Sequence, residues 1–122
     1  MSDYGTVLGS ICHHEIPSPD LERQQAFYGA VFGWQFTQMH PGYVLFSDGL
    51  TGGGLDAAAQ PSASGAVFVI ATEEVSAALE RIREAGGTPL TAKAQCGPNT
   101  DHGFYAYFRD PCGNRVGVWS RT

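Results

Sequence analysis

Residues 104–119 read FYAYFRDPCGNRVGVW and join two strand-like runs through the turn sequence DPCGN at residues 110–114. On each side of the turn, side-chain character alternates with a period of two, as it does along a β-strand. Pro111 presets the φ angle of a turn's second position, while Gly113 and Asn114 tolerate the positive φ that a tight reversal needs. This stretch therefore predicts a β-hairpin near the end of the chain.

The first half of the chain predicts a strand, a helix and further short strands. Residues 10–16 read as the strand, and Ser18 is placed to cap an amphipathic helix that runs to about Phe32 and stops at Gly33. Short strands are expected at residues 34–38, 43–47 and 52–57. The last of these contains three successive glycines, which have no side chains to pack and leave room for a ligand or another backbone.

The same order recurs in the second half at the same spacing. A strand is expected at residues 66–71, and Thr72 is placed to cap a helix with two glutamates in its first turn and Gly86-Gly87 at its end. Two repeats of a strand, a helix and three strands therefore fill a single domain of residues 1–122. The first module spans about residues 7–58, a linker about 59–65, and the second module about 66–121. One helix covers one face of each set of strands, so the other face must be buried otherwise or form a cavity.

Composition excludes several kinds of partner. The chain has 122 residues and a net charge of -5, with no basic patch, so we expect no nucleic-acid or anionic-membrane binding. Three cysteines without a CxxC spacing are expected to be free thiols. No segment resembles a signal peptide or approaches a membrane span of about 20 apolar residues, which predicts a cytoplasmic protein.

Three stretches carry a resemblance to a known group of proteins. They are CHHEIP (residues 12–17) leading into QAFYGAVFGW (25–34), VSAALERIREAGG (75–87), and the terminal hairpin. Together they resemble the vicinal oxygen chelate superfamily, the glyoxalase, bleomycin-resistance and extradiol dioxygenase group, in its small two-module form. The resemblance implies an α+β fold of two tandem βαβββ modules whose curled mixed sheets surround a cleft, commonly in a homodimer.

The resemblance also allows the metal site to be checked position by position. Members that bind a divalent metal place a His, Glu or Gln on the first and last strands of each module. Here His13 is the only clear match, Val67 and Gly117 stand at two other positions, and the fourth falls at residues 54–56. A catalytic metal normally needs three protein ligands, so we expect no complete metal centre and assign no cofactor.

His13 and Glu15 are expected to point to the same face of the first strand, which the resemblance makes the cavity side. They are candidates for holding a ligand's polar edge or for proton transfer, and equally for satisfying each other at a rim. Together with Asp56 they are the one set that could still hold a metal.

Aromatic side chains form a second candidate binding surface. Tyr105, Tyr107 and Trp119 share the face of Gly117, which faces the cavity in metal-binding relatives, and Trp34 lies on another flanking strand. Such rings can stack against a flat organic ligand, although core packing is the ordinary alternative. His102 belongs to a loop that we expect at the cleft mouth, where it would contact a ligand or simply be solvated.

Two functions of different class are consistent with these residues, and a third is a further alternative. The first is a metal-independent protein that binds a small aromatic or hydrophobic compound in its cleft. The second is a divalent-metal-dependent lyase, isomerase or dioxygenase of the glyoxalase-like kind. The third is a dimeric interaction module with a vestigial cleft. The chain has no phosphate loop, nucleophile elbow, dinucleotide fingerprint or HExxH motif, which disfavours hydrolase and nucleotide chemistry.

Overall fold

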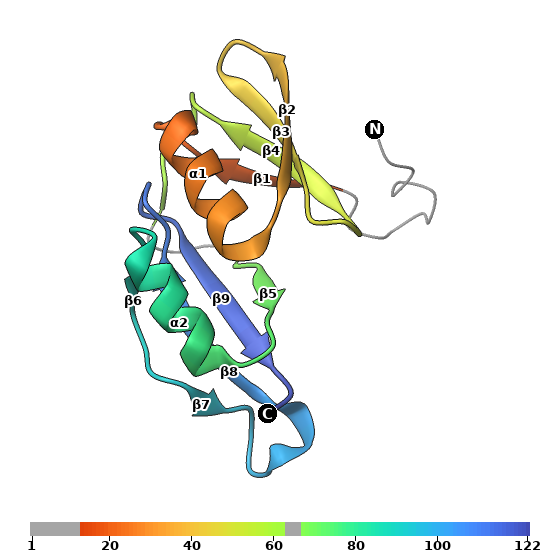
Figure 1. Ribbon diagram of the computed structural model, residues 1–122, viewed down its shortest axis with the longest axis vertical. Coiled ribbons are helices and arrows are strands. Elements are labelled where there is room, and N and C mark those ends of the chain that lie inside the picture. Colours follow the sequence, from red (N-terminus) through yellow and green to blue (C-terminus); the bar gives the residue numbers. More distant parts are fainter. Residues whose placement is uncertain (1–12, 63–66) are drawn as a thin grey trace. The chain divides into compact units, whose positions relative to one another are not determined.

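The computed structural model describes residues 13–62 and 67–122, and the chain forms two compact units, Met1–Pro61 and Ser62–Thr122 (Figure 1). The first unit contains β1 (His14–Pro17), α1 (Leu21–Phe32), β2 (Gln35–His40), β3 (Tyr43–Ser47) and β4 (Gly52–Asp56). The second contains β5 (Val69–Ala71), α2 (Val75–Glu84), β6 (Thr88–Pro89), β7 (Ala94–Gln95), the 3₁₀ helix η1 (Thr100–His102), β8 (Phe104–Arg109) and β9 (Arg115–Ser120). This arrangement confirms the expected α+β fold.

The two sheets follow the same plan. In the first unit the strand order is β1-β4-β3-β2, and β1 runs parallel to β4 while the other pairs are antiparallel. In the second unit the order is β5-β9-β8-β6, with β5 parallel to β9 and β7 also paired with β8. In both sheets the strand before the helix therefore pairs with the last strand, as a repeated unit requires.

The strand boundaries agree with the expected ones to within a few residues. The expected first strand began at residue 10, but residues 10–12 lie outside the described part, as does residue 66 of the expected second-module strand. The second-module strand begins at Val69, and the strand expected from residue 34 begins at Gln35. The terminal hairpin forms as expected, and its two strands pair from Phe104 opposite Ser120 to Arg109 opposite Arg115.

Helix α1 begins two residues later than a Ser18 cap would place it. Asp20 is the N-cap, and its side chain accepts a hydrogen bond from Arg23 N at 3.1 Å. Ser18 is instead fully buried, donating to Ile16 O at 3.0 Å and accepting from Gln24 Nε2 at 3.2 Å. The predicted cap was therefore wrong, because the serine hydroxyl is used to join the end of β1 to the helix face. The predicted stop is confirmed, since Gly33 has a φ of 73°.

A stack of three aromatic rings forms the core of the first unit. The Trp34 ring lies 4.5 Å from Tyr28 of α1 and 4.4 Å from Phe46 of β3, with both pairs within 10° of parallel. Trp34 is only 7% exposed. The stack joins the helix to the sheet and defines the face that α1 covers, and no other helix of the described residues 13–62 covers the opposite face.

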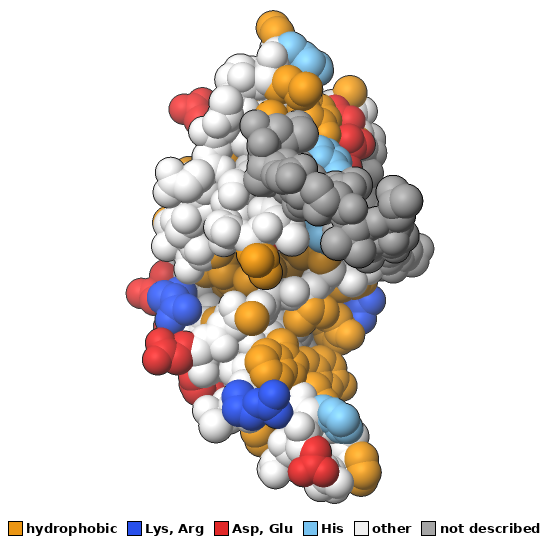
Figure 2. Space-filling model, turned by 90° about the vertical axis from the view of Figure 1, so that its right-hand side faces the viewer, with side chains coloured by type: hydrophobic (Ala, Val, Ile, Leu, Met, Phe, Trp, Pro, Cys, Tyr) orange, Lys and Arg blue, Asp and Glu red, His pale blue; other side chains and the backbone are white. Residues whose placement is uncertain are grey.

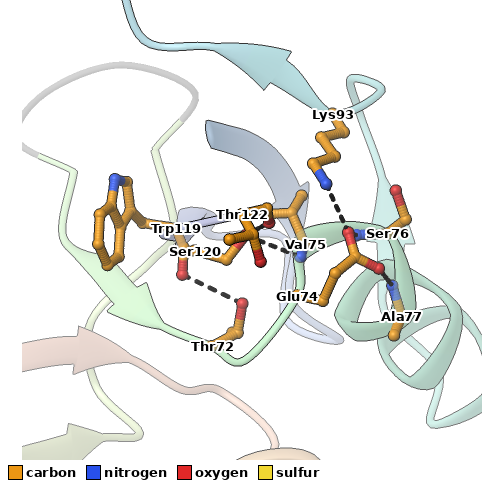
Figure 3. Close-up of polar contacts among 9 residues, drawn as sticks. All are labelled: Thr72, Glu74, Val75, Ser76, Ala77, Lys93, Trp119, Ser120 and Thr122. Atoms are coloured by element: carbon orange, nitrogen blue, oxygen red, sulfur yellow. Dashed lines mark hydrogen bonds and ion pairs between the residues drawn. The ribbon is translucent and has the colours of Figure 1, made fainter. Parts of the chain in front are cut away.

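Helix α2 is capped by a carboxylate where a threonine was predicted. Glu74 accepts hydrogen bonds from Ser76 N at 2.8 Å and Ala77 N at 3.1 Å, and Lys93 Nζ lies 2.9 Å from its carboxylate (Figure 3). The Lys93 contact, followed by the backbone bonds, lowers the pKa of Glu74 from 4.5 to about 2. Thr72 was the wrong cap, because its backbone N and Oγ1 both donate to Trp119 O.

The lowered pKa of Glu74 predicts a specific pH dependence of stability. The ionised Glu74 carboxylate raises the free energy of unfolding. This stabilisation is fully present above the unfolded pKa of about 4.5 and is lost as pH falls towards the folded pKa of about 2. We expect Glu74→Gln to lower Tm at pH 7, and the difference from wild type to shrink between pH 4.5 and pH 2. Calorimetry across this range measures it, with the exposed neighbour Glu73→Gln as control. A difference that stays constant with pH would contradict the assignment.

Neither α-helix in the described residues could cross a membrane. Helix α1 has 12 residues and α2 has 10, against the roughly 20 apolar residues that a membrane span needs.

Candidate functional site

The open face of the second sheet is built from alternate residues of β8 and β9. Trp119 lies opposite Tyr105, Gly117 opposite Tyr107, and Arg115 opposite Arg109. The residues between them face the other way and are buried on the α2 side, namely Ala106, Phe108, Val116 and Val118. The strand period therefore separates an aromatic and cationic face from the aliphatic core.

This open face is hollowed. A cavity of about 270 Å³ is lined by Val69, Cys96, Tyr105, Ala106, Tyr107, Gly117, Val118 and Trp119. Figure 2 shows hydrophobic side chains gathered on the second unit in this view. The prediction that the two tyrosines and the tryptophan share the face of Gly117 is confirmed by the strand register.

Gly117 keeps the floor of the hollow open. A Cβ added there would lie 3.0 Å from Val69 Cγ2 and 3.4 Å from Tyr107 Cε1, so a methyl group would press on the valine and fill the space beside the tyrosine ring. The missing side chain leaves backbone and ring edges as the floor. Such a surface suits a flat apolar group that approaches closely.

The tryptophan at one end of the hollow is held in place by several bonds. Trp119 Nε1 donates to His102 O at 2.7 Å, and the Trp119 carbonyl accepts from Thr72 Oγ1 at 3.1 Å. Figure 3 shows the indole ring pointing away from α2. The side chain of His102 is exposed in η1, and the contact of this residue with the site is made by its backbone carbonyl, which orients the indole.

The first unit carries a separate polar cluster. Tyr43 Oη donates to Glu15 Oε2 at 2.9 Å and lies 3.0 Å from His13 Nε2. Since the tyrosine proton points to the carboxylate, its oxygen accepts from the Nε2-protonated tautomer of His13. The predicted pair His13 and Glu15 therefore share one partner, Tyr43, which the sequence alone did not single out.

Strand register explains how Tyr43 reaches this position. Glu15 pairs with Gly54, and a Cβ added to Gly54 would lie 2.0 Å from Tyr43 Oη. The hydroxyl therefore occupies the space that any side chain at residue 54 would need. Close approach at the triple glycine, expected from the sequence, is made by this ring and, at Gly53, by the backbone oxygen of His14. The signal in the sequence was the glycine run itself.

The donors within each unit do not fit a divalent metal. Of the four positions that the resemblance assigns to metal ligands, His13 has a metal-binding side chain, Val67 and Gly117 have none, and residues 54–56 offer only Asp56. Asp56 Oδ1 accepts from Ala58 N at 2.9 Å. Among residues 13–62 and 67–122, no three His, Cys, Asp or Glu side chains gather closely enough to hold a metal ion.

The remaining predicted site residue lies elsewhere. Trp34 belongs to the buried aromatic stack on the α1 side of the first sheet. It shares a face neither with the polar cluster of the first unit nor with the hollow of the second. The structure therefore brings together His13 with Glu15, and Tyr105 with Tyr107 and Trp119, but leaves Trp34 in the core.

Comparisons with known proteins agree with this architecture. A family model described as the Glyoxalase/Bleomycin resistance protein/Dioxygenase superfamily matches residues 10–118. A glyoxylase-like domain-containing protein from Didymella fabae is 28% identical over 93% of this chain and 94% of its own length.

Solved structures resemble the chain at lower sequence identity. A glyoxalase/bleomycin resistance protein/dioxygenase family enzyme from Burkholderia phytofirmans gives a TM-score of 0.76 at 18% identity, covering 91% of this chain and 98% of that one. A lactoylglutathione lyase from Agrobacterium tumefaciens gives 0.68 at 22% identity, covering 92% and 93%. A fosfomycin resistance protein from Mesorhizobium loti gives 0.67 at 18% identity, covering 95% of each chain. At these identities the likeness establishes the fold.

Proposed function

Because the chain belongs to the glyoxalase/bleomycin resistance protein/dioxygenase superfamily, we propose that it binds a small aromatic or hydrophobic organic compound without a complete metal centre. The observation that carries the proposal is the hollow of the second unit, with Tyr105, Tyr107 and Trp119 on its walls. Apolar concave surfaces with a few placed polar groups are the usual form of small-molecule sites, and aromatic rings favour flat ligands.

The donor chemistry supports binding over metal-dependent catalysis. Glycines stand at the last-strand positions of both units, and in the first unit a tyrosine hydroxyl fills the space above one of them. His13, Glu15 and Tyr43 instead form a hydrogen-bonding cluster that can offer a donor and acceptors to the polar edge of a ligand. Related structures include both a lyase and a resistance protein, so the fold leaves either kind of activity open.

Binding is tested with a neutral flat probe, 2-naphthalenemethanol, by isothermal titration calorimetry. We expect wild type to bind it and Trp119→Ala to lose about tenfold or more in affinity, because one wall of the hollow is removed. Leu90→Ala is the matched control, since Leu90 is a 42% exposed apolar residue of the same unit that does not line the hollow. Equal losses in both variants, or no binding by wild type, would contradict the proposal.

Metal dependence is tested on the same protein. We expect protein purified without chelator to contain no stoichiometric metal, and divalent cations to leave its Tm unchanged. A stoichiometric metal, or a cation-induced rise in Tm that disappears in His13→Ala, would favour the glyoxalase-like lyase, isomerase or dioxygenase. We also expect the protein to be a homodimer, which sedimentation analysis would decide.

A further inference from the structure

We propose that the compound held in the hollow carries a carboxylate beside its aromatic ring, and that Arg115 and Arg109 bind this group. This inference rests on the proposed function and narrows it to aromatic carboxylates. It begins with the order of residues along the open face of β8 and β9, which passes from an aromatic pair to a cationic pair.

Three cross-strand pairs follow one another along that face. Trp119 with Tyr105 comes first, the gap at Gly117 beside Tyr107 second, and Arg115 with Arg109 third. Alternate residues of a strand lie roughly 7 Å apart, so the arginine pair lies about that distance from the gap. A planar ring seated over the glycine therefore brings a carboxylate on its edge within reach of the guanidinium groups.

Neither arginine of the pair forms an ion pair within the described residues, and the Asp110 carboxylate in the turn between them is engaged by Cys112 and Asn114. Like charges directly opposite each other on a sheet are destabilising. Among the described residues the two ion pairs are Arg83 with Glu80 and Lys93 with Glu74, so neither Arg109 nor Arg115 pairs with a carboxylate there. This cationic pair belongs to a chain of net charge -5. Charge complementarity therefore favours an anionic group at this end of the hollow.

The two arginines also have fixed positions. The Arg115 guanidinium lies 4.0 Å from the centre of the Tyr107 ring, and Arg109 Nη1 donates to Gly113 O at 2.9 Å. A guanidinium held against an aromatic face keeps N–H groups at its edge, and these can bind a carboxylate in bidentate geometry. Tyr107, which lines the hollow, therefore links the ring-binding surface to the anion-binding group.

The opposite end of the hollow has one cation of a different kind. Arg121 lies 5.1 Å from the Trp119 ring and donates to the backbone carbonyl of Asp101 at 2.9 Å. A single arginine offers a carboxylate fewer N–H donors and less positive charge than two arginines on paired strands. The arginine pair at the Tyr107 end is therefore the assigned position, and Arg121 serves as the comparison.

The experiment compares 2-naphthoate with the neutral 2-naphthalenemethanol by calorimetry. We expect wild type to bind the carboxylate roughly tenfold to a hundredfold more tightly than the alcohol. Arg115→Gln should bring the two affinities close together by weakening naphthoate alone, while Arg83→Gln on the exposed face of α2 leaves both unchanged. Raising the salt concentration should weaken naphthoate binding and not that of the alcohol.

Each outcome decides between the two proposals. Equal wild-type affinity for both probes would overturn the carboxylate assignment and leave the proposed function standing. If wild type binds neither 2-naphthoate nor 2-naphthalenemethanol, both the carboxylate assignment and the proposed function are overturned. A carboxylate preference that survives Arg115→Gln but is lost in Arg121→Gln would overturn the assignment to the arginine pair. The wild-type comparison does not depend on the folding of any variant.

Discussion

Replacing Trp34 with alanine is expected to lower the free energy of unfolding by about 3–5 kcal/mol, the range for removing a large aromatic from a core. The indole is 7% exposed and lies between Tyr28 at 4.5 Å and Phe46 at 4.4 Å. Alanine at this position leaves a cavity between the Tyr28 and Phe46 rings. The loss is a large part of the 5–15 kcal/mol that is typical of a folded domain.

Urea unfolding followed by circular dichroism measures this loss, with Trp34→Phe as a control that keeps an aromatic ring and should lose much less. Below the unfolding transition, the alanine variant should still bind 2-naphthalenemethanol, since Trp34 is not part of the hollow. A small change in the free energy of unfolding together with a loss of probe binding would indicate that Trp34 contributes to the ligand site and not to the core.

Replacing Asp110 with alanine is the second large expected loss, about 3 kcal/mol in the free energy of unfolding. The side chain is 3% exposed. Oδ1 accepts from Cys112 N at 3.0 Å and Asn114 N at 2.9 Å, while Oδ2 accepts from Asn114 Nδ2 at 2.8 Å. Alanine leaves these donors without the acceptor that organises the turn between β8 and β9.

The matched variant Asp110→Asn keeps one acceptor oxygen and should lose clearly less than alanine in the same urea experiment. Both changes act at the hairpin that carries the aromatic hollow, so probe affinity should fall with Asp110→Ala even at temperatures where the protein remains folded. Identical stabilities of wild type and Asp110→Ala would show that the turn is held by its backbone bonds alone.

The hairpin and the helix stop were predictable because their chemistry is local. The turn was expected at residues 110–114, and within it Asp110 accepts from Cys112 N while the Arg109 side chain donates to Gly113 O. Gly33 has the left-handed φ that its position required. In each case the residues that determine the conformation are neighbours in the sequence, so no tertiary contact was needed to predict it.

The predicted caps were wrong because both side chains form other hydrogen bonds in the folded chain. Ser18 bonds Gln24 and Ile16 instead of capping α1. Thr72 could begin α2, but it bonds the carbonyl of Trp119, a residue 47 positions away. A side chain engaged over that distance carries no signal in its local sequence.

The site was only partly predictable for a similar reason. The period of two placed Tyr105, Tyr107 and Trp119 on one face, and this is confirmed. Trp34 was expected at the start of a strand, but β2 begins one residue later, and the indole turns to the helix side. Tyr43 gains its two partners only because β1, β4 and β3 lie side by side, which depends on the register of three strands.

The contact between Tyr43 and Gly54 also constrains how this sequence can change. Any side chain at residue 54 must displace the Tyr43 ring, which breaks its hydrogen bonds to Glu15 and His13. Replacing Gly54 alone with an acidic residue is therefore expected to lower the free energy of unfolding, because the Tyr43 ring must move. The same replacement in a chain with a small residue at position 43 avoids this loss. The two positions are epistatic, and the order in which they mutate determines which intermediates fold well. A new functional side chain at position 54 therefore requires that Tyr43 be replaced first.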